Sequence, residues 1–142
     1  QQMTRLFIAA ALAALVTLVT RFVDRRRTRH PLAVRRGALP TQVPAVEVGL
    51  DDGPAIIIFT ESSCRSCQDA IRLIRGPAGA GISVADIEYG AQPELHKRFD
   101  IDTVPTTVVV DEKGSVVAGW TGRVDLSELT LALAEVVQSE LD

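Results

Sequence analysis

The chain has 142 residues, 46% of them hydrophobic, and a net charge of -3, which allow one domain with a sizeable core plus an additional segment. Its only cysteines are Cys64 and Cys67, which excludes a small secreted disulfide framework and a site with four zinc thiolates. The two histidines show no ligand spacing, so we expect no metal and no cofactor. Residues 1–44 carry a net +7 and residues 45–142 a net -10, which predicts two parts in different surroundings.

Residues 1–23 are predicted to form a transmembrane anchor. Residues 6–19 are apolar and uncharged, and their flanks extend the stretch to about 20 residues, enough to cross a bilayer. Apolar residues would lie on all sides of this helix, which disfavours a surface helix of a soluble protein. The small-residue segment Ala11–Ala13 lies inside the apolar stretch, which favours a retained anchor over a cleaved signal peptide. We therefore expect residues 3–23 to contact the lipid bilayer.

The distribution of arginine predicts the orientation of this anchor. One arginine precedes the apolar stretch and five follow within ten residues. Arginine-rich flanks stay in the cytoplasm, so we expect a single-pass protein of the cytoplasmic (inner or plasma) membrane whose domain faces the cytoplasm. The basic block contains no interleaved aromatic residues and adjoins the apolar stretch, so a membrane flank explains it better than a nucleic-acid partner. Ala10 and Ala14, or Ala9 and Ala13, form small-xxx-small pairs suited to packing against a membrane protein complex. The alternative, slightly favoured, is that alanine is present simply as a common helix former.

Residues 24–44 are predicted to be a basic linker, followed by a domain at residues 45–142. Pro31, Pro40 and Pro44 punctuate the linker, and prolines at this spacing favour an extended tether over a helix.

Strands and helices are predicted to alternate in the domain, which indicates the α/β class. The expected elements are a weak edge strand at 45–49, a buried strand at 55–60, a helix at 67–75, a strand at 82–87, a short helix at 93–99, a strand at 106–110, a strand at 115–120 and a helix at 126–141. After the weak edge strand the order is β-α-β-α-β-β-α. We expect the three strands joined through helices to be parallel and the final hairpin strand to be antiparallel.

The two cysteines lie at the start of a predicted helix, directly after a buried strand and a polar turn. Free N–H groups and the macrodipole at a helix N-terminus stabilise a thiolate, so we expect Cys64 to be the nucleophile, with a lowered pKa. Cys67 follows one turn later on the same face and is the predicted resolving thiol. Arg65 and Ser66 lie between them and are expected to tune the thiolate. A structural pair or half of a metal site is the disfavoured alternative, because no other cysteine and no placed histidine is available.

Residues 45–142 resemble a thioredoxin-fold domain. The strand before the Cys-x-x-Cys pair, the dithiol at a helix start, the segment Thr103–Thr106 and the closing hairpin and helix carry the resemblance. It implies a central mixed sheet in which Pro105 is a cis-proline facing the dithiol. It also implies that Val104 and Pro105 bind an extended segment of a protein thiol or disulfide substrate, which pairs like an added strand.

The chain departs from thioredoxins proper at several positions. Ser63 replaces the tryptophan before the first cysteine, Ile58 replaces the buried aspartate six residues before it, and the central pair is Arg-Ser. These departures weigh against general thioredoxin activity.

Two functions from different classes stay open at this stage. The favoured one is a membrane-tethered thiol–disulfide oxidoreductase that uses Cys64 and Cys67 on protein substrates. The alternative is an accessory subunit of a membrane protein complex, in which a thioredoxin-fold domain docks a partner and the dithiol senses redox state or is idle.

Overall fold

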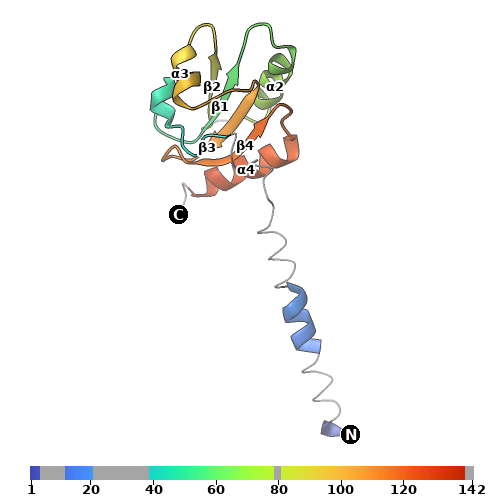
Figure 1. Cartoon of the computed structure of the whole chain (residues 1–142). Helices are drawn as coiled ribbons and strands as arrows, with labels where there is room; N and C mark the ends of the chain where they lie inside the picture. Colours follow the sequence, from blue (N-terminus) through green and yellow to red (C-terminus); the bar gives the residue numbers. More distant parts are fainter. Residues whose placement is uncertain (4–11, 21–38, 79–80, 140–142) are drawn as a thin grey trace. The chain divides into compact units, whose positions relative to one another are not determined.

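The structure of the chain is a computed structural model that describes residues 1–3, 12–20, 39–78 and 81–139. The chain divides into two units, Gln1–Pro31 and Leu32–Asp142 (Figure 1). In the first unit, residues 12–20 are helical. Within the described ranges, no helix has both the length and the apolar character needed to cross a membrane. Much of the predicted anchor and linker, at residues 4–11 and 21–38, lies outside these ranges.

A four-stranded mixed sheet forms the centre of the second unit, in the order β2-β1-β3-β4 (Figure 1). Its strands are β1 (Ala55–Thr60), β2 (Ser83–Glu88), β3 (Thr106–Val110) and β4 (Val116–Thr121). Strand β1 pairs parallel with β2 and antiparallel with β3, and β3 pairs antiparallel with β4. Every residue of β1 and β3 is buried, which matches the mostly apolar and β-branched character of these central strands.

The direction of β3 differs from the expectation that it would lie parallel to β1. The connection between β2 and β3 contains one short helix, α3 (Pro93–Arg98). A helix between two strands does not require them to be parallel, because the chain on either side of the helix can return it to the end of the sheet that it left. The connection returns to the end of the sheet where β2 finishes, so that Thr106 pairs with Phe59 and β3 runs antiparallel to β1.

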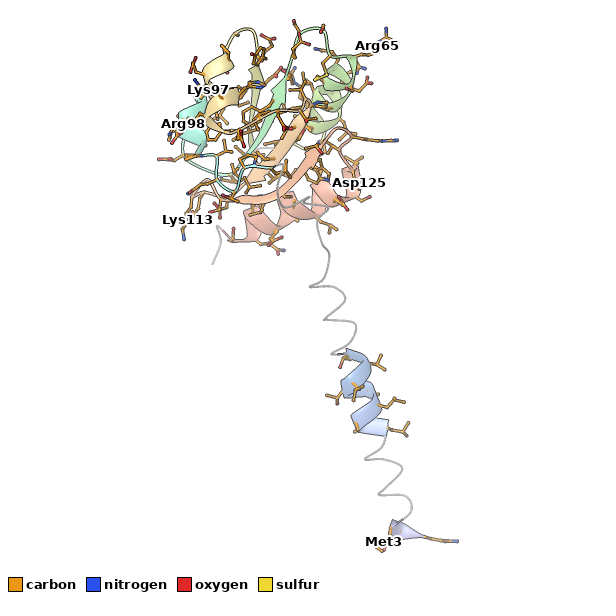
Figure 2. All side chains as sticks on the ribbon, in the orientation of Figure 1. Met3, Arg65, Lys97, Arg98, Lys113 and Asp125 are labelled. Carbon is orange, nitrogen blue, oxygen red and sulfur yellow. A yellow bond between two sulfur atoms is a disulfide. The ribbon has the colours of Figure 1, made fainter. Side chains whose placement is uncertain are left out.

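Two apolar layers cover the two faces of the sheet, and β1 contributes alternate residues to each. Ile56 and Ile58 face α2 (Arg65–Arg75) and α4 (Leu126–Ser139). Ile57 and Phe59 face the opposite layer, which includes residues of α3 and of the segment before β1. Helix α4 begins after Asp125 (Figure 2), whose Oδ1 accepts a hydrogen bond from the N–H of Glu128 at 3.0 Å.

The weak edge strand expected at residues 45–49 is instead a 3₁₀ helix, η1 (Ala45–Val48). Pro44 precedes it, and Gly49 ends it in the left-handed conformation at φ 83°. The buried residues Ala45 and Val48 are three positions apart, which is the repeat of a 3₁₀ helix. An apolar spacing of three was therefore misinterpreted as strand alternation.

Residues 39–43, which were expected in the linker, pack on the domain. Val43 is fully buried, and its N–H donates to the carbonyl of Gly114 at 2.7 Å. Gly114 has φ 76°, and a Cβ atom there would approach the Cα of Pro44 to 2.6 Å, so the turn between β3 and β4 requires glycine. The packed domain therefore begins before residue 45.

Candidate functional site

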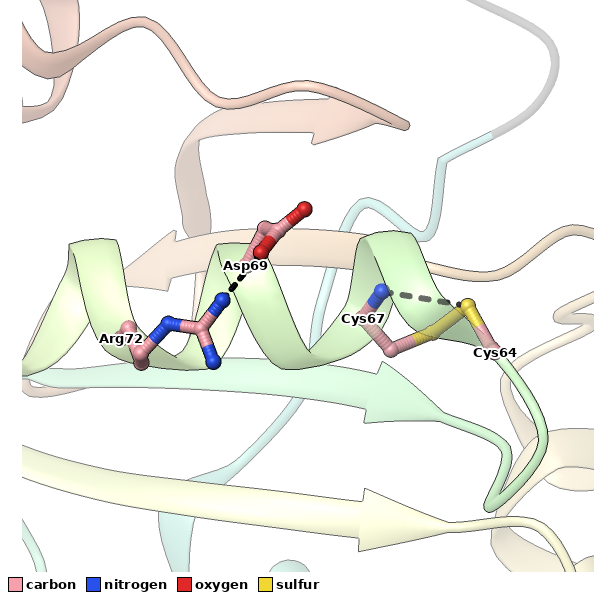
Figure 3. A network of polar contacts seen from close by, with 4 residues as sticks. All are labelled: Cys64, Cys67, Asp69 and Arg72. Atoms are coloured by element: carbon pink, nitrogen blue, oxygen red, sulfur yellow. Dashed lines mark hydrogen bonds and ion pairs between the residues drawn. A yellow bond between two sulfur atoms is a disulfide. The ribbon is translucent and has the colours of Figure 1, made fainter.

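Helix α2 begins at the cysteine pair. Cys64 is the N-cap residue, with an extended backbone (φ -80°, ψ 105°). The N–H of Cys67 donates to the Cys64 Sγ at 3.1 Å (Figure 3). This sulfur takes the place of the serine or aspartate oxygen that usually caps a helix. Because the free N–H groups and the positive end of the macrodipole meet here, the position stabilises a thiolate at Cys64.

Cys64 and Cys67 form a disulfide, with a sulfur–sulfur distance of 2.17 Å and Cα atoms 5.3 Å apart (Figure 3). The two sulfurs belong to residues with different access to solvent. Cys67 is fully buried, whereas Cys64 is half-buried. Thiol–disulfide exchange depends on which sulfur an external thiol can reach. Of the two sulfurs, that of Cys64 is therefore the one nearer to solvent, and the roles of Cys64 as nucleophile and Cys67 as resolving thiol stay a prediction.

Ser66 and Arg65, the two predicted tuning residues, differ in their position. The Ser66 Oγ lies 3.4 Å from the Cys64 Sγ, within hydrogen-bond distance for sulfur. The Arg65 side chain is exposed and points away from the domain (Figure 2). Ser66 thus contacts the Cys64 sulfur directly, while Arg65 contributes positive charge to the surface beside it.

The turn before Cys64 is held partly by the carboxylate of Glu61. It accepts hydrogen bonds from the side chain and the N–H of Ser63 and from the hydroxyl of Ser62. The hydrogen bonds from Ser63 hold the pKa of Glu61 below its ordinary value.

Glu88, at the end of β2, supports the same turn from a distant part of the sequence. Its carboxylate accepts the N–H of Ser62 at 3.1 Å and the N–H of Ala91 at 2.8 Å. Hydrogen bonds from the backbone of Gly90 and Ala91 are the main cause of its lowered pKa. This residue was not predicted from the sequence, because only the pairing of Thr60 with Glu88 brings it to the turn.

Pro105 lies at the same end of the sheet as the dithiol, where β1 ends and β3 begins. The Val104–Pro105 peptide bond is cis, as the resemblance implied. Because Phe59 pairs with Thr106, the start of β3 lies beside the end of β1, from which the chain leads to Cys64. Pro105 is buried and its carbonyl accepts the N–H of Gly122 at 2.7 Å. Val104 is half-buried, and within residues 39–78 and 81–139 its backbone groups have no hydrogen-bond partner.

Solved structures of several thioredoxins are similar to this structure. The structure is similar to a mutant thioredoxin from Halobacterium salinarum (TM-score 0.55, 22% identity, 63% of this chain and 80% of that one). It is also similar to thioredoxin 1 from Thermosipho africanus (TM-score 0.54, 19% identity, 62% of this chain and 99% of that one). A third similar structure is the germline-specific thioredoxin Deadhead from Drosophila melanogaster (TM-score 0.51, 22% identity, 61% of this chain and 83% of that one). The domain has a thioredoxin-like fold. No protein-family model and no curated protein matches the chain. At these identities the likeness establishes the fold alone.

A groove of about 410 Å³ runs beside the dithiol of the thioredoxin-like domain. It lies between α2 and the loop that follows β4, and it is lined by Ser66, Asp69, Ala70, Leu73, Gly122, Arg123 and Val124. Ser66 lines the groove and contacts the Cys64 sulfur, so the groove lies close to that sulfur. Asp69 is ion-paired with Arg72 on the outer surface of α2 (Figure 3). The groove was not predicted from the sequence, because its two walls are about 50 residues apart in the chain.

Proposed function

We propose that the chain is a membrane-tethered thiol–disulfide oxidoreductase that acts on protein substrates. One observation carries the redox part of this proposal. The Cys64–Cys67 disulfide lies at the N-terminus of α2. The more accessible Cys64 is the N-cap residue, and the buried Cys67 lies in the first turn of the helix. The cis-Pro105 at the same end of the sheet and the adjoining groove add a surface on which a polypeptide segment can lie.

The chemistry uses the two sulfurs in sequence. The Cys64 thiolate attacks one sulfur of a substrate disulfide, forms a mixed disulfide and releases the other substrate sulfur as a thiolate. The Cys67 thiolate then attacks the Cys64 Sγ, closes the Cys64–Cys67 disulfide and releases the second substrate sulfur. The substrate gains two electrons and the protein loses two, and the protons of the protein thiols end on the released sulfurs. A thiol reductant reverses these steps on the protein and regenerates the dithiol.

Val104 supplies backbone groups for substrate binding in this proposal. Its N–H and carbonyl precede β3 and are free of partners within the described part of the domain. An extended substrate segment can pair with them as an additional strand, which would hold a substrate cysteine near Cys64.

The apolar helix at residues 12–20 supports the tether. Its large apolar side chains are exposed, including Leu15 at 60% and Leu18 at 71%. The hydroxyl groups of Thr17 and Thr20 donate to backbone carbonyls of the preceding turn, so neither needs water. A helix of this kind fits a lipid environment, in which polar groups must be satisfied internally. The arginines that follow favour the cytoplasmic side for the domain.

Flotation with lipid vesicles tests the tether. We expect the full chain to float with phosphatidylcholine–phosphatidylglycerol vesicles. Leu15→Arg combined with Leu18→Arg should release it, because each arginine near the centre of a span costs about 2.5–3.5 kcal/mol. Leu131→Glu, at an exposed position of α4, is the matched control and should float like the wild type. A wild-type chain that stays with the dense fraction, or a double variant that still floats, would contradict the tether.

Catalysed insulin reduction tests the redox function. We expect the full chain in mild detergent to accelerate insulin reduction by dithiothreitol above the rate of dithiothreitol alone. A rate equal to that of dithiothreitol alone would favour the accessory-subunit alternative. In that case a membrane complex should persist when Cys64→Ser and Cys67→Ser are combined.

A further inference from the structure

The basic residues of the domain gather around the groove beside the dithiol. Residues 45–142 contain seventeen acidic residues and only seven lysines and arginines. Four of these seven belong to α2 or to the loop that follows β4, the two walls of the groove: Arg65, Arg72, Arg75 and Arg123. Within α2, Asp69 is the one acidic residue. A locally basic surface on an acidic domain complements a partner of negative charge.

Arg123 supplies the positive charge of the groove itself. It lines the groove, it is exposed, and within the described residues it makes no ion pair. The carboxylate of Asp69, on the opposite wall, is already ion-paired with Arg72 (Figure 3). Asp125, two residues after Arg123, caps α4 through the N–H of Glu128 and does not line this groove. The guanidinium of Arg123 is therefore available to a carboxylate that enters the groove.

The other lining residues are largely apolar and lead to the Cys64 sulfur. Ala70 and Leu73 come from α2, and Val124 comes from the opposite wall. Ser66 also lines the groove, and its Oγ lies 3.4 Å from the Cys64 Sγ. The volume of about 410 Å³ is within the range of small-ligand pockets and suits a short polypeptide segment. A segment in the groove would thus place apolar atoms along α2 and a cysteine near Cys64.

We propose that the groove selects substrate segments in which an acidic residue lies close to the reactive cysteine, and that Arg123 pairs with this carboxylate. The inference rests on the proposed redox function and names its substrate class. An arginine and a carboxylate can form two parallel hydrogen bonds, which fix the orientation of the segment. Opposite charge also raises the local concentration of such segments beside the dithiol. Arg123 is thus a specificity-determining residue that takes no part in the sulfur exchange.

Reaction with two matched peptides tests the inference. Each peptide carries one cysteine as a disulfide with pyridine-2-thiol, and the residues beside this cysteine are glutamate in one peptide and glutamine in the other. The full chain with Cys67→Ser, in mild nonionic detergent, is the parent protein. Its Cys64 thiolate attacks the peptide sulfur, the disulfide of the peptide breaks, and pyridine-2-thiolate leaves and takes up a proton, so the absorbance of the released thione gives the rate.

We expect the parent protein to react about two- to fivefold faster with the acidic peptide at low salt, the effect of one exposed ion pair. Arg123→Gln should abolish this preference and Arg123→Glu should reverse it, while the rate with the neutral peptide stays within about twofold. Arg75→Gln is the matched control, because it removes the same charge from the last turn of α2 and Arg75 does not line the groove. It should keep the preference.

Three results would overturn the inference and leave the redox function intact: equal rates with the two peptides, a preference that Arg123→Gln keeps, or an equal loss in Arg75→Gln. A preference that weakens as the protein concentration rises would also overturn it, because the acidic surface of a second copy would then occupy the groove. If neither peptide reacts faster than with the chain that combines Cys64→Ser and Cys67→Ser, the proposed function is refuted, and the inference with it.

Discussion

Replacing Cys64 by serine is expected to lower the protein-dependent rate of insulin reduction by about 100-fold or more, because a serine hydroxyl is not ionised at neutral pH and cannot replace the thiolate. Cys64 is the N-cap residue and the more accessible of the two cysteines, which is why the proposal assigns it the contact with the substrate. The measurement is the initial rate for the full chain in mild detergent, after subtraction of the rate with dithiothreitol alone.

Lys113→Ala provides the control for this experiment. Lys113 is exposed in the turn between β3 and β4 (Figure 2), and the site described above does not include it. Its rate should stay within about twofold of the wild type, as for other surface substitutions of small energetic effect. A Cys64→Ser chain that keeps more than about a tenth of the wild-type rate would show that Cys64 is not the nucleophile.

Phe59→Ala is expected to lower the free energy of unfolding by about 3–5 kcal/mol, the usual cost of removing a large buried aromatic side chain. Phe59 is fully buried on the sheet face that carries α3. Its ring contacts His96 edge-on at a centroid distance of 5.3 Å and Phe99 at 6.0 Å. Alanine would therefore leave a cavity between β1 and α3 and remove both aromatic contacts.

Urea unfolding of the full chain, with the disulfide intact, measures this change. Leu131→Ala is the matched control, because Leu131 is 60% exposed on α4 and its truncation should cost less than about 0.5 kcal/mol. A loss below about 1.5 kcal/mol for Phe59→Ala would mean that the core layer around Phe59 contributes less to stability than its burial indicates.

Local sequence signals were sufficient to predict most of the helices and strands of the domain. The apolar residues of β1, the proline at the start of α3 and the glycine of the β3–β4 turn each specify their own element, and the structure places these elements close to the predicted boundaries. The direction of β3 could not be predicted in the same way. It depends on the end of the sheet to which the connection after β2 returns the chain, and that is set by packing across the sheet.

The same holds for the candidate site: residues close together in the sequence could be predicted, and residues that only the fold brings together could not. Cys64, Cys67 and Ser66 could be identified because a helix start, a dithiol and a neighbouring hydroxyl are close in sequence. The cis form of Pro105 was implied by resemblance, since the residues alone do not specify it. Glu88 reaches the turn before Cys64 through strand register, which joins residues far apart in the chain. No local pattern marks this residue.

Mass spectrometry of a trapped mixed disulfide tests the redox mechanism most directly. The full chain with Cys67→Ser should react with a disulfide-containing protein and remain linked to it, because the resolving thiol is missing. Peptide mapping should place the link at Cys64, dithiothreitol should release the substrate, and the chain with both Cys64→Ser and Cys67→Ser should form no such product. A Cys67→Ser chain that forms no mixed disulfide, or a Cys64→Ser chain that forms one at Cys67 in equal yield, would contradict the roles assigned to the two sulfurs.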